Sequence, residues 1–297
     1  MLAQCLEALQ IDPEGTYVDA TFGGGGHSLG MLERIKGGRL IAFDQDEDAQ
    51  KEADKIDHRS FTFCKTNFRY MKKYLKLNGI TTVNGILADL GVSSHQFDSP
   101  GRGFSTRFEG PLDMRMDQAT GKTAEHVVMT YPEEQLHKVF GMYGELKNAR
   151  TAAKEIVMVR KKGALKTTMD LKSALKNIAP RGKENKYFAQ VFQALRIEVN
   201  EEMKALEDFL HQCAEVTAPK GRLVIMSYHS LEDRMVKNFL NTGKAFGELE
   251  KDFYGNPLRP FEPVVRKAVE ADEEEVEKNN RARSARLRVG ERMVIKE

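Results

Sequence analysis

The chain has 297 residues, enough to bury a sizeable core as one large domain or two smaller ones. Its 46 basic and 44 acidic residues leave a formal net charge of +2, so a surface that attracts a polyanion must be local. Cys5, Cys64 and Cys213 have neither paired nor metal-like spacing, which predicts a reducing compartment. No apolar run is long enough to span a bilayer and the N-terminus lacks a secretory pattern, so we expect a cytoplasmic protein without membrane contacts.

Residues 1–9 are predicted to form a helix, and residues 17–27 a strand followed by a glycine turn. Four consecutive glycines leave room for the close approach of a ligand, and a second helix begins just after them. Residues 39–43 read as a buried strand that ends at Asp44, where such folds place a carboxylate for ribose hydroxyls. The two features together predict an adenosine-type cofactor, whereas the glycine run alone predicts only a flexible turn.

The spacing of the glycines separates two kinds of cofactor. A dinucleotide loop needs the pattern Gly-x-Gly-x-x-Gly, which fails here whether it is read from Gly23 or from Gly25. Asp19, just before the loop, would repel a pyrophosphate, and it suits the ammonium end of S-adenosylmethionine. The loop therefore favours a methyl donor over NAD.

Alternating elements continue as far as residue 90. A polar helix at 46–55, a strand at 61–64, a helix through 68–77 and a strand at 83–90 give the order β-α-β-α-β-α-β. That order predicts an α/β fold with a doubly wound parallel sheet, whose ligands bind beyond the carboxyl ends of the strands. Asp19, Asp44 and Asp89 are all expected at that edge.

From residue 97 to residue 200 the alternation is lost. Residues 97–116 form a glycine-, proline- and arginine-rich loop, and helices are predicted at 130–140, 148–159 and 168–178. We therefore expect a discontinuous core of residues 1–96 and 201–297, with a helical insertion at 97–200 that recognises an RNA substrate.

The last part of the chain returns to the sheet pattern. The predicted elements are a helix at 198–217, a turn at 218–221, a strand at 222–227, a helix at 231–240 and strands at 262–268 and 285–289. The acidic run at 270–277 is predicted to be a solvated loop.

Basic residues are concentrated between positions 147 and 186, where 12 Lys or Arg face 3 Asp or Glu. This surface suits phosphates, and a solvated helical surface explains it equally well. The same two explanations apply to Arg281, Arg283, Arg286 and Arg288. A further group mixes guanidinium groups with rings, as sites that stack exposed RNA bases do. That group is Arg102, Phe104, Arg107 and Phe108.

Seven blocks of sequence, in order along nearly the whole chain, resemble the RsmH (MraW) family of bacterial 16S ribosomal RNA (cytosine-N4) methyltransferases. The blocks are TFGGGGH at 21–27, DLGVSS at 89–94, RGFS at 102–105, GPLDMRM at 110–116, FQALRI at 192–197, SYHSLEDR at 227–234 and NRARS at 280–284. The resemblance implies a class I methyltransferase fold, a Rossmann-like doubly wound sheet with a helical insertion, that uses S-adenosylmethionine. It also implies methyl transfer to the N4 amine of a cytidine in the decoding centre of the small ribosomal subunit.

The resemblance also assigns residues to the cofactor site. The positions that match the family's cofactor contacts are Gly25, Gly26, His27, Asp44, Phe68, Asp89 and Gln96. At its start the sequence departs from the family, whose members have a tail with a His-x-Pro-Val-type segment where this chain has residues 1–4.

Transfer to the N4 amine, a poor nucleophile, requires alignment with the donor and an acceptor for its N–H, and no metal. The candidate catalytic residues are Asp89, Ser93, Tyr228 and His229. Turn chemistry alone explains Ser93, and a structural role explains His229 equally well. Candidates for the RNA pocket are Arg102, Phe104, Asp113 and Arg115, of which the last two also suit an internal ion pair.

Two further alternatives stay open at this stage. A DNA amino-methyltransferase has the same core, but its (Asp/Asn/Ser)-Pro-Pro-aromatic motif is missing from this sequence. A non-catalytic RNA-binding assembly factor requires only the basic insertion.

Overall fold

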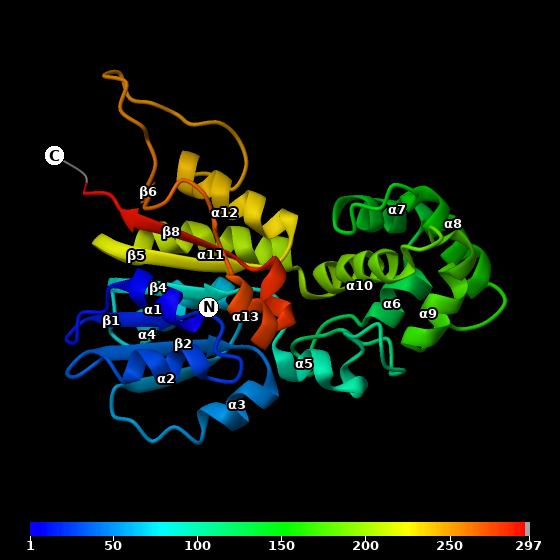
Figure 1. Cartoon of the computed structure of the whole chain (residues 1–297), viewed down its shortest axis with the longest axis horizontal. Helices are drawn as coiled ribbons and strands as arrows, with labels where there is room; N and C mark the ends of the chain where they lie inside the picture. The colour runs from blue at the N-terminus through cyan, green and yellow to red at the C-terminus, as the bar shows by residue number, and fades with distance from the viewer. Residues whose placement is uncertain (295–297) are drawn as a thin grey trace. The chain divides into compact units, whose positions relative to one another are not determined.

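Residues 1–294 are described by the computed structural model, in which the chain divides into two units (Figure 1). The first unit comprises Met1–Gly91 and Met203–Glu297, and the second comprises Val92–Glu202. The sheet belongs to the first unit, so the chain leaves the sheet after its fourth strand and returns to it more than 100 residues later.

Within residues 1–294, one mixed sheet of eight strands has the order β3-β2-β1-β4-β5-β8-β6, with β7 paired to β8. The strands β1 to β5 pair in parallel, and β8 pairs antiparallel with β5, β6 and β7. The order reverses at β1, between β2 and β4, which is where doubly wound sheets bind ligands. The bounds are β1 (Thr16–Asp19), β2 (Arg39–Asp44), β3 (Phe61–Lys65), β4 (Val83–Asp89), β5 (Thr217–Ser227), β6 (Phe261–Pro263), β7 (Val269–Glu270) and β8 (Arg286–Arg292).

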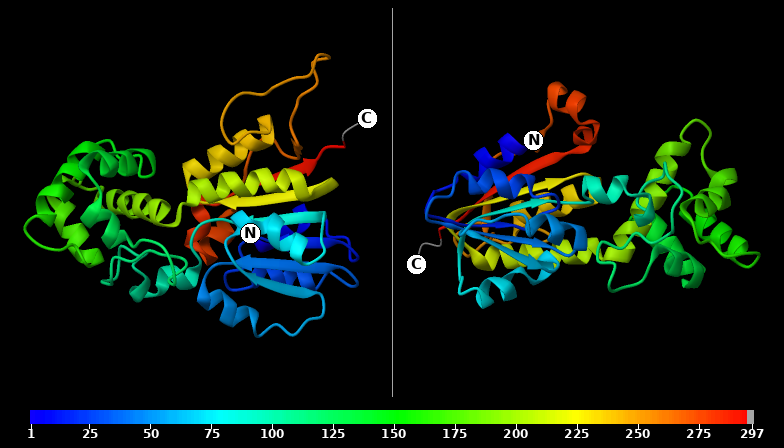
Figure 2. Two further views of the ribbon diagram at one scale, coloured as in Figure 1. Left: turned by 180° about the vertical axis from the view of Figure 1, so that it is seen from behind. Right: turned by 90° about the horizontal axis from the view of Figure 1, so that it is seen from below.

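Helices cover both faces of the sheet. Successive side chains of a strand point to opposite faces, so neighbouring residues are buried under different helices. Val18 and Ile41 pack with α4, α11 and α12, whereas Tyr17 and Leu40 pack with α1 and α2 on the other face. Figure 1 looks onto α1 and α2, and the view from behind in Figure 2 looks onto α11. The helices of this unit are α1 (Leu2–Leu9), α2 (Gly26–Leu32), α3 (Glu47–Ala53), α4 (Met71–Leu77), α11 (Glu202–Val216), α12 (Ser230–Thr242) and α13 (Glu273–Lys278), with the 3-10 helices η1 (Phe68–Tyr70) and η4 (Asn280–Ser284).

The α/β class and the parallel strands predicted for residues 1–90 are confirmed. Three predictions near the C-terminal end are wrong. The predicted turn at 218–221 lies inside β5, whose pairing with β4 shifts register between Val83 and Gly85. The predicted strand at 262–268 extends only over Phe261–Pro263. The acidic run forms α13, because the Asp272 side chain accepts a hydrogen bond from Glu275 N at 2.8 Å and acidic groups favour a first helical turn.

The second unit is helical and has its own core. Its longest helix, α10 (Glu184–Asn200), was not predicted, and it buries Tyr187, Val191 and Leu195 among the other helices. The remaining elements are α5 (Ser94–Asp98), α6 (Ala124–Thr130), α7 (Glu133–Met142), α8 (Ala149–Arg160), α9 (Thr168–Leu175), η2 (Pro100–Arg102) and η3 (Lys176–Ile178). No helix within residues 1–294 combines the length and the apolar content needed to cross a bilayer.

The predicted helix at 198–217 is two helices. Asn200 ends α10, and Glu201 adopts a left-handed conformation with φ of 50° before α11 begins. The Asn200 side chain donates to Met114 O at 2.8 Å and accepts from Met116 N at 2.7 Å, so it fastens the loop of residues 97–116 to the end of α10.

Candidate active site

The glycine turn lies at the carboxyl edge of the sheet, between β1 and α2. Gly25 has a φ of 81°, and a Cβ there would lie 2.8 Å from the ring of Phe22, so the position requires glycine. A Cβ at Gly24 or Gly26 would meet no described atom within 4 Å. The backbone of the turn is therefore open to a ligand that approaches closely.

Asp19 supports the glycine turn through two hydrogen bonds. Its side chain is fully buried, and it accepts hydrogen bonds from Ser28 Oγ at 2.7 Å and from Thr21 N at 3.1 Å. Burial raises the pKa of this carboxyl group, and the two hydrogen bonds oppose the rise. The expectation that Asp19 receives the ammonium group of a donor is corrected, because its oxygens face the turn and have no exposed surface.

Asp44 ties the end of β2 to the glycine turn. Its Oδ2 accepts from Gly23 N at 2.8 Å, and its Oδ1 accepts from Asp46 N at 3.0 Å. Burial raises its pKa to about 6, against the lowering effect of these two bonds. Each carboxylate oxygen has a second lone pair, so Asp44 can accept hydroxyl hydrogen bonds from a bound sugar as well.

Phe68 follows β3 at the same edge of the sheet. Asn67 Nδ2 donates to Gln45 Oε1 at 3.0 Å and so links the end of β3 to the residue after Asp44. The Phe68 ring packs edge-on against Phe209 of α11, with a centroid separation of 5.0 Å. This contact orients a partly buried aromatic ring against the core that lies under this edge of the sheet.

Asp89, at the end of β4, is held by groups from three directions. Its N–H donates to Thr21 Oγ1 at 2.6 Å, and its Oδ1 accepts from the Tyr228 hydroxyl at 2.8 Å. Its Oδ2 lies 3.9 Å from His27 Nδ1. Burial raises the pKa of Asp89 to about 6, although Tyr228 and His27 favour the ionised form, and burial also raises the pKa of Tyr228.

His27, Asp89 and Tyr228 line a pocket of about 180 Å³ in the first unit. His27 Nε2 is buried there and has no hydrogen-bond partner within residues 1–294. An orphaned buried polar atom requires a partner, and a ligand in this pocket would supply one. The pocket therefore fits a small ligand with a polar end.

His229 has a structural role. As the N-cap of α12, it accepts from Glu232 N through Nδ1 at 3.4 Å, and its Nε2 lies 3.1 Å from Glu232 Oε1. Glu232 Oε2 also accepts from Tyr228 N at 2.9 Å. His229 therefore caps α12 through Nδ1, whereas its buried Nε2 makes no hydrogen bond within residues 1–294, and a role for His229 toward substrate stays a prediction.

Ser93 and Gln96 belong to the second unit and form a capping box at the start of α5. Ser93 Oγ accepts from Gln96 N at 3.2 Å, and Gln96 Oε1 accepts from Ser93 N at 3.0 Å. This reciprocal pairing explains both residues at that turn, and a catalytic role for Ser93 stays a prediction.

Of the four predicted RNA-pocket residues, all in the second unit, Arg102 and Phe104 are buried, and Asp113 and Arg115 are partly exposed. Arg102 and Phe104 are each only 5% exposed, and Arg102 donates to the carbonyl groups of Arg115 and Met116. Arg115 Nε lies 2.9 Å from Asp113 Oδ1, and hydrogen bonds from Arg115 lower the pKa of Asp113 although burial raises it. These contacts give the four side chains a role in supporting the loop, and RNA contacts by them stay a prediction.

Basic side chains remain exposed elsewhere in the second unit. Arg160 and Lys172 are bound to backbone carbonyl groups, whereas most others of the 147–186 stretch lie at the surface of α8, α9 and their connections. In the first unit, Arg288 pairs with Asp233 at 2.7 Å and Arg286 with Glu270 at 3.4 Å. The 147–186 stretch therefore keeps an exposed basic surface on the second unit, and Arg283 of the other cluster is exposed on the first unit.

Two supporting residues were missed in the sequence. Thr21 Oγ1 connects the glycine turn to Asp89, and only the folded β1–β4 pairing brings these positions together. Glu232 holds Tyr228 and His229, and its position three residues after the N-cap was a readable capping signal.

The arrangement has a clear chemical preference. Asp44 and Asp89, each with a pKa of about 6, are mostly ionised at neutral pH, and this negative charge beside the turn opposes a pyrophosphate and favours a cationic ligand that carries hydroxyl groups. S-adenosylmethionine, with its sulfonium, ammonium and ribose, fits this set of groups better than NAD.

Comparison with known proteins agrees with this chemistry. The profile of the MraW methylase family matches residues 1–293. The chain is 56% identical over 292 residues, 98% of both chains, to the ribosomal RNA small subunit methyltransferase H of Cytophaga hutchinsonii. It is 51% identical to the protein of the same name from Amoebophilus asiaticus, over 99% of this chain and 95% of that one. The chain therefore belongs to the MraW methylase family, whose members use S-adenosylmethionine.

Proposed function

We propose that this chain methylates the N4 amine of a cytidine in the decoding centre of 16S ribosomal RNA, within the small ribosomal subunit. The observation that carries the proposal is the 56% identity, over 98% of both chains, to a protein named ribosomal RNA small subunit methyltransferase H. S-adenosylmethionine supplies the methyl group on its sulfonium. A ribosomal substrate also implies a cytoplasmic site of action.

We assign donor binding to a set of residues that the glycine turn and the strand ends carry. The set is Gly25, Gly26, His27, Asp44, Phe68, Asp89 and Gln96. Asp44 would accept the ribose hydroxyl groups, and the open backbone at Gly26 would allow close approach. His27 and Asp89 line the pocket suited to the polar amino-acid end. Gln96, which belongs to the second unit, is assigned to donor binding from the family motif alone.

Asp89 is the candidate acceptor for the N4 amine. Its pKa of about 6 leaves it mostly ionised at neutral pH, so it can accept an N–H hydrogen bond as the nitrogen loses its conjugation with the ring. Tyr228 donates to Asp89 Oδ1 and fixes the direction of the second oxygen. We therefore treat Tyr228 as a positioning residue.

The second unit is the proposed RNA-recognition domain. Its exposed Lys and Arg side chains on α8, α9 and their connections would contact phosphates, and the target base would leave its stack to reach the donor. Arg107 is exposed on the loop of residues 97–116, and its guanidinium lies 5.7 Å from the Phe97 ring centroid and 5.8 Å from that of Phe108.

The direct test uses small ribosomal subunits isolated from cells that lack this modification. Incubation with the chain and methyl-labelled S-adenosylmethionine, followed by nucleoside analysis of the 16S RNA, should yield N4-methylcytidine. Asp44→Ala, which should bind the donor more weakly, provides a control with reduced methyl transfer. Label in another nucleoside would refute the N4 assignment, and donor binding without any methyl transfer would favour an assembly factor.

A further inference from the structure

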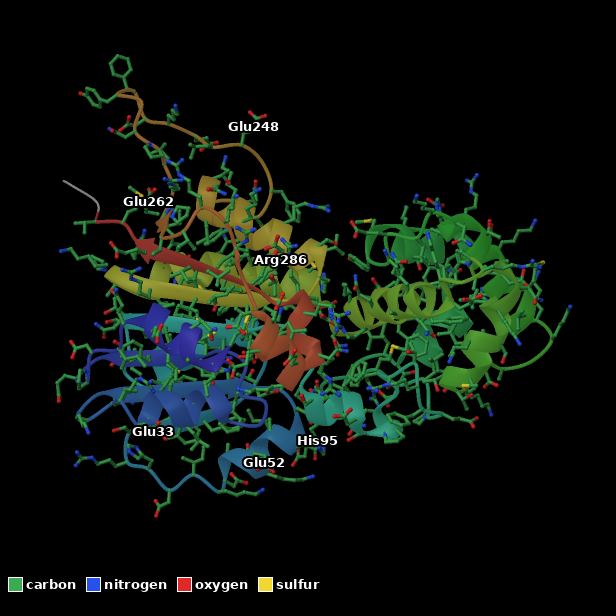
Figure 3. The ribbon with its side chains drawn as sticks, in the orientation of Figure 1. Glu33, Glu52, His95, Glu248, Glu262 and Arg286 are labelled. Atoms are coloured by element: carbon green, nitrogen blue, oxygen red, sulfur yellow. The ribbon has the colours of Figure 1, made fainter. Side chains whose placement is uncertain are left out.

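The pocket of about 180 Å³ beside His27 and Asp89 has a second wall, which comes from the C-terminal part of the chain. This wall belongs to α13 and η4, and Figure 1 shows α13 beside the N-terminal end of α1. The chain continues from η4 into β8, whose first residue, Arg286, is labelled in Figure 3. The residues of this wall that line the pocket are Glu275, Asn279, Ala282 and Ala285. A segment far along the sequence from the glycine turn therefore forms one side of the candidate donor pocket.

Glu275 directs its carboxylate group toward this pocket. It is the third residue of α13, and its N–H donates to the Asp272 cap at 2.8 Å. A glutamate at this position of a helix can return a hydrogen bond to the cap residue. Its Oε2 instead lies 2.7 Å from the α-ammonium group of Met1, which also lines the pocket. The Glu275 side chain is 30% exposed, so the carboxylate has a defined direction and is still open to a ligand.

Glu275 supplies a carboxylate that the other acidic residues of the site do not. Asp19 is fully buried against the glycine turn, and Asp44 lies at the proposed ribose end. Asp89, the candidate acceptor for the N4 amine, already accepts the hydrogen bond from the Tyr228 hydroxyl. An ammonium group that is taken partly out of water needs a negative charge close by. Among the described residues that line the pocket, Glu275 is the remaining acidic group.

The polar groups of the pocket match both charges of an α-amino acid. A carboxylate offers about four acceptor sites on its two oxygens, so Glu275 can hold a second ammonium group beside that of Met1. His27 Nε2 is buried at the pocket without a hydrogen-bond partner within residues 1–294, and a ring N–H there can donate to a carboxylate. The pocket therefore offers an acceptor for an ammonium group and a donor for a carboxylate group.

We propose that Glu275 receives the ammonium group of S-adenosylmethionine while His27 Nε2 donates to its carboxylate group. This role rests on the proposed function, in which the donor occupies this pocket. A charge-assisted hydrogen bond at the amino-acid end holds the part of the donor that lies beyond the sulfonium from the ribose, and so helps to place the methyl group. The segment of residues 273–285 thereby takes part in donor binding.

The test measures, by isothermal titration, the affinity of the whole chain for three ligands that differ at the amino-acid end. S-adenosylmethionine and S-adenosylhomocysteine both carry the ammonium group, whereas methylthioadenosine lacks the whole amino-acid end. Glu275→Gln, which removes the charge and keeps the size, should weaken binding of the first two ligands roughly tenfold and leave methylthioadenosine within about twofold. Glu277→Gln, the same change at an exposed position of α13, should leave all three affinities unchanged.

Equal affinity of the wild type and Glu275→Gln for S-adenosylhomocysteine would overturn the inference. An equal loss for all three ligands, with a lower free energy of unfolding, would also overturn it, because Glu275 would then act only by holding α13 against Met1. A loss confined to S-adenosylmethionine would overturn it in favour of a contact with the sulfonium. These titrations contain no RNA, so a wild-type chain that binds the donor without methylating small subunits would refute the proposed function and leave the role of Glu275 standing.

Discussion

At the scale of single residues, Asp44 connects the end of β2 to the glycine turn of the candidate site. It already accepts two backbone hydrogen bonds, so replacement by alanine removes both the support of the turn and the proposed ribose acceptor. A hydrogen bond to a charged group is worth about 1.5–3 kcal/mol, so Asp44→Ala should weaken S-adenosylmethionine binding roughly tenfold to a hundredfold. Isothermal titration measures this.

Asp57→Ala is the matched control, because Asp57 is exposed in the connection after α3 and should leave donor affinity unchanged. Equal donor affinity in wild type and Asp44→Ala would exclude Asp44 from the site.

The raised pKa values of Asp44 and Asp89 predict a pH dependence with opposite signs for binding and for stability. Both groups have a pKa of about 6 through burial. Donor binding requires the ionised forms, so affinity should fall as pH decreases through 6. The unliganded fold gains stability over the same range, because the folded protein binds protons more tightly than the unfolded chain, whose carboxyl pKa is 3.8.

Donor titrations and unfolding transitions between about pH 5 and pH 8 check both signs. An Asp89→Asn variant should reduce, without abolishing, the pH dependence of both the donor affinity and the stability, because Asp44 still titrates. Donor affinity that does not vary with pH would contradict the assignment of both carboxylates.

Tyr228 acts through Asp89, so its replacement should change a titration as well as a rate. Tyr228→Phe removes the hydroxyl donor at 2.8 Å, which favours the ionised carboxylate, and the pKa of Asp89 should rise further. We expect kcat to fall roughly tenfold, as for loss of one hydrogen bond to a charged group. The acidic limb of the pH–rate profile should move to higher pH.

Tyr70→Phe, which removes the hydroxyl of a half-exposed tyrosine on η1, is the control. A lower kcat without a shift of the acidic limb would show that Tyr228 does not act on Asp89.

At the scale of elements, the basic surface that follows α8 should contribute electrostatically to RNA binding. Lys161 and Lys162 are exposed just after Arg160 ends that helix. The double variant Lys161→Ala/Lys162→Ala should reduce RNA affinity, and the slope of log affinity against log salt should become less steep by roughly one to two. Fluorescence anisotropy at several salt concentrations measures the slope.

Lys76→Ala, at the end of α4 in the first unit, is the control for removal of one exposed charge. An unchanged salt slope in the double variant would remove this surface from the RNA contact.

The strands β1 to β4 were predictable because each has a short apolar run, and β1, β2 and β4 end in an aspartate. Val18 and Tyr17 illustrate the reason, since opposite faces of the sheet bury both and the run therefore has no polar gap. The donor-site carboxylates followed from the same ends, because parallel strands bring their carboxyl ends to one edge.

The sequence analysis failed where a helix cap outweighed the hydrophobic pattern, or where contacts distant in the sequence decided the structure. The acidic run lacked apolar spacing, yet the Asp272 cap and the acidic first turn suffice to form α13. Arg102 and Phe104 looked like a stacking surface, because sequence does not reveal that their loop folds inward. Thr21 and Tyr228 support Asp89 through contacts between positions 68 and 139 residues apart, which local patterns do not reveal.

At the scale of the whole molecule, the chain forms separate hydrophobic cores in its two units. The first unit is built from both ends of the sequence, and the second from the middle. A helical unit with its own buried side chains does not need the sheet to complete its core, so substitutions on its surface should leave the donor site intact. This separation makes it possible to measure RNA affinity and donor affinity independently.

The sheet also constrains the order of events during translation. β4 pairs with β1 on one side and β5 on the other, but the ribosome makes the whole of Val92–Glu202 before β5 emerges. At a synthesis rate of roughly 5–20 residues per second, the β5-facing edge of β4 lacks its hydrogen-bond partners for on the order of ten seconds. During that interval this edge can pair with strands of other chains, so we expect the nascent chain to bind a chaperone at the tunnel exit.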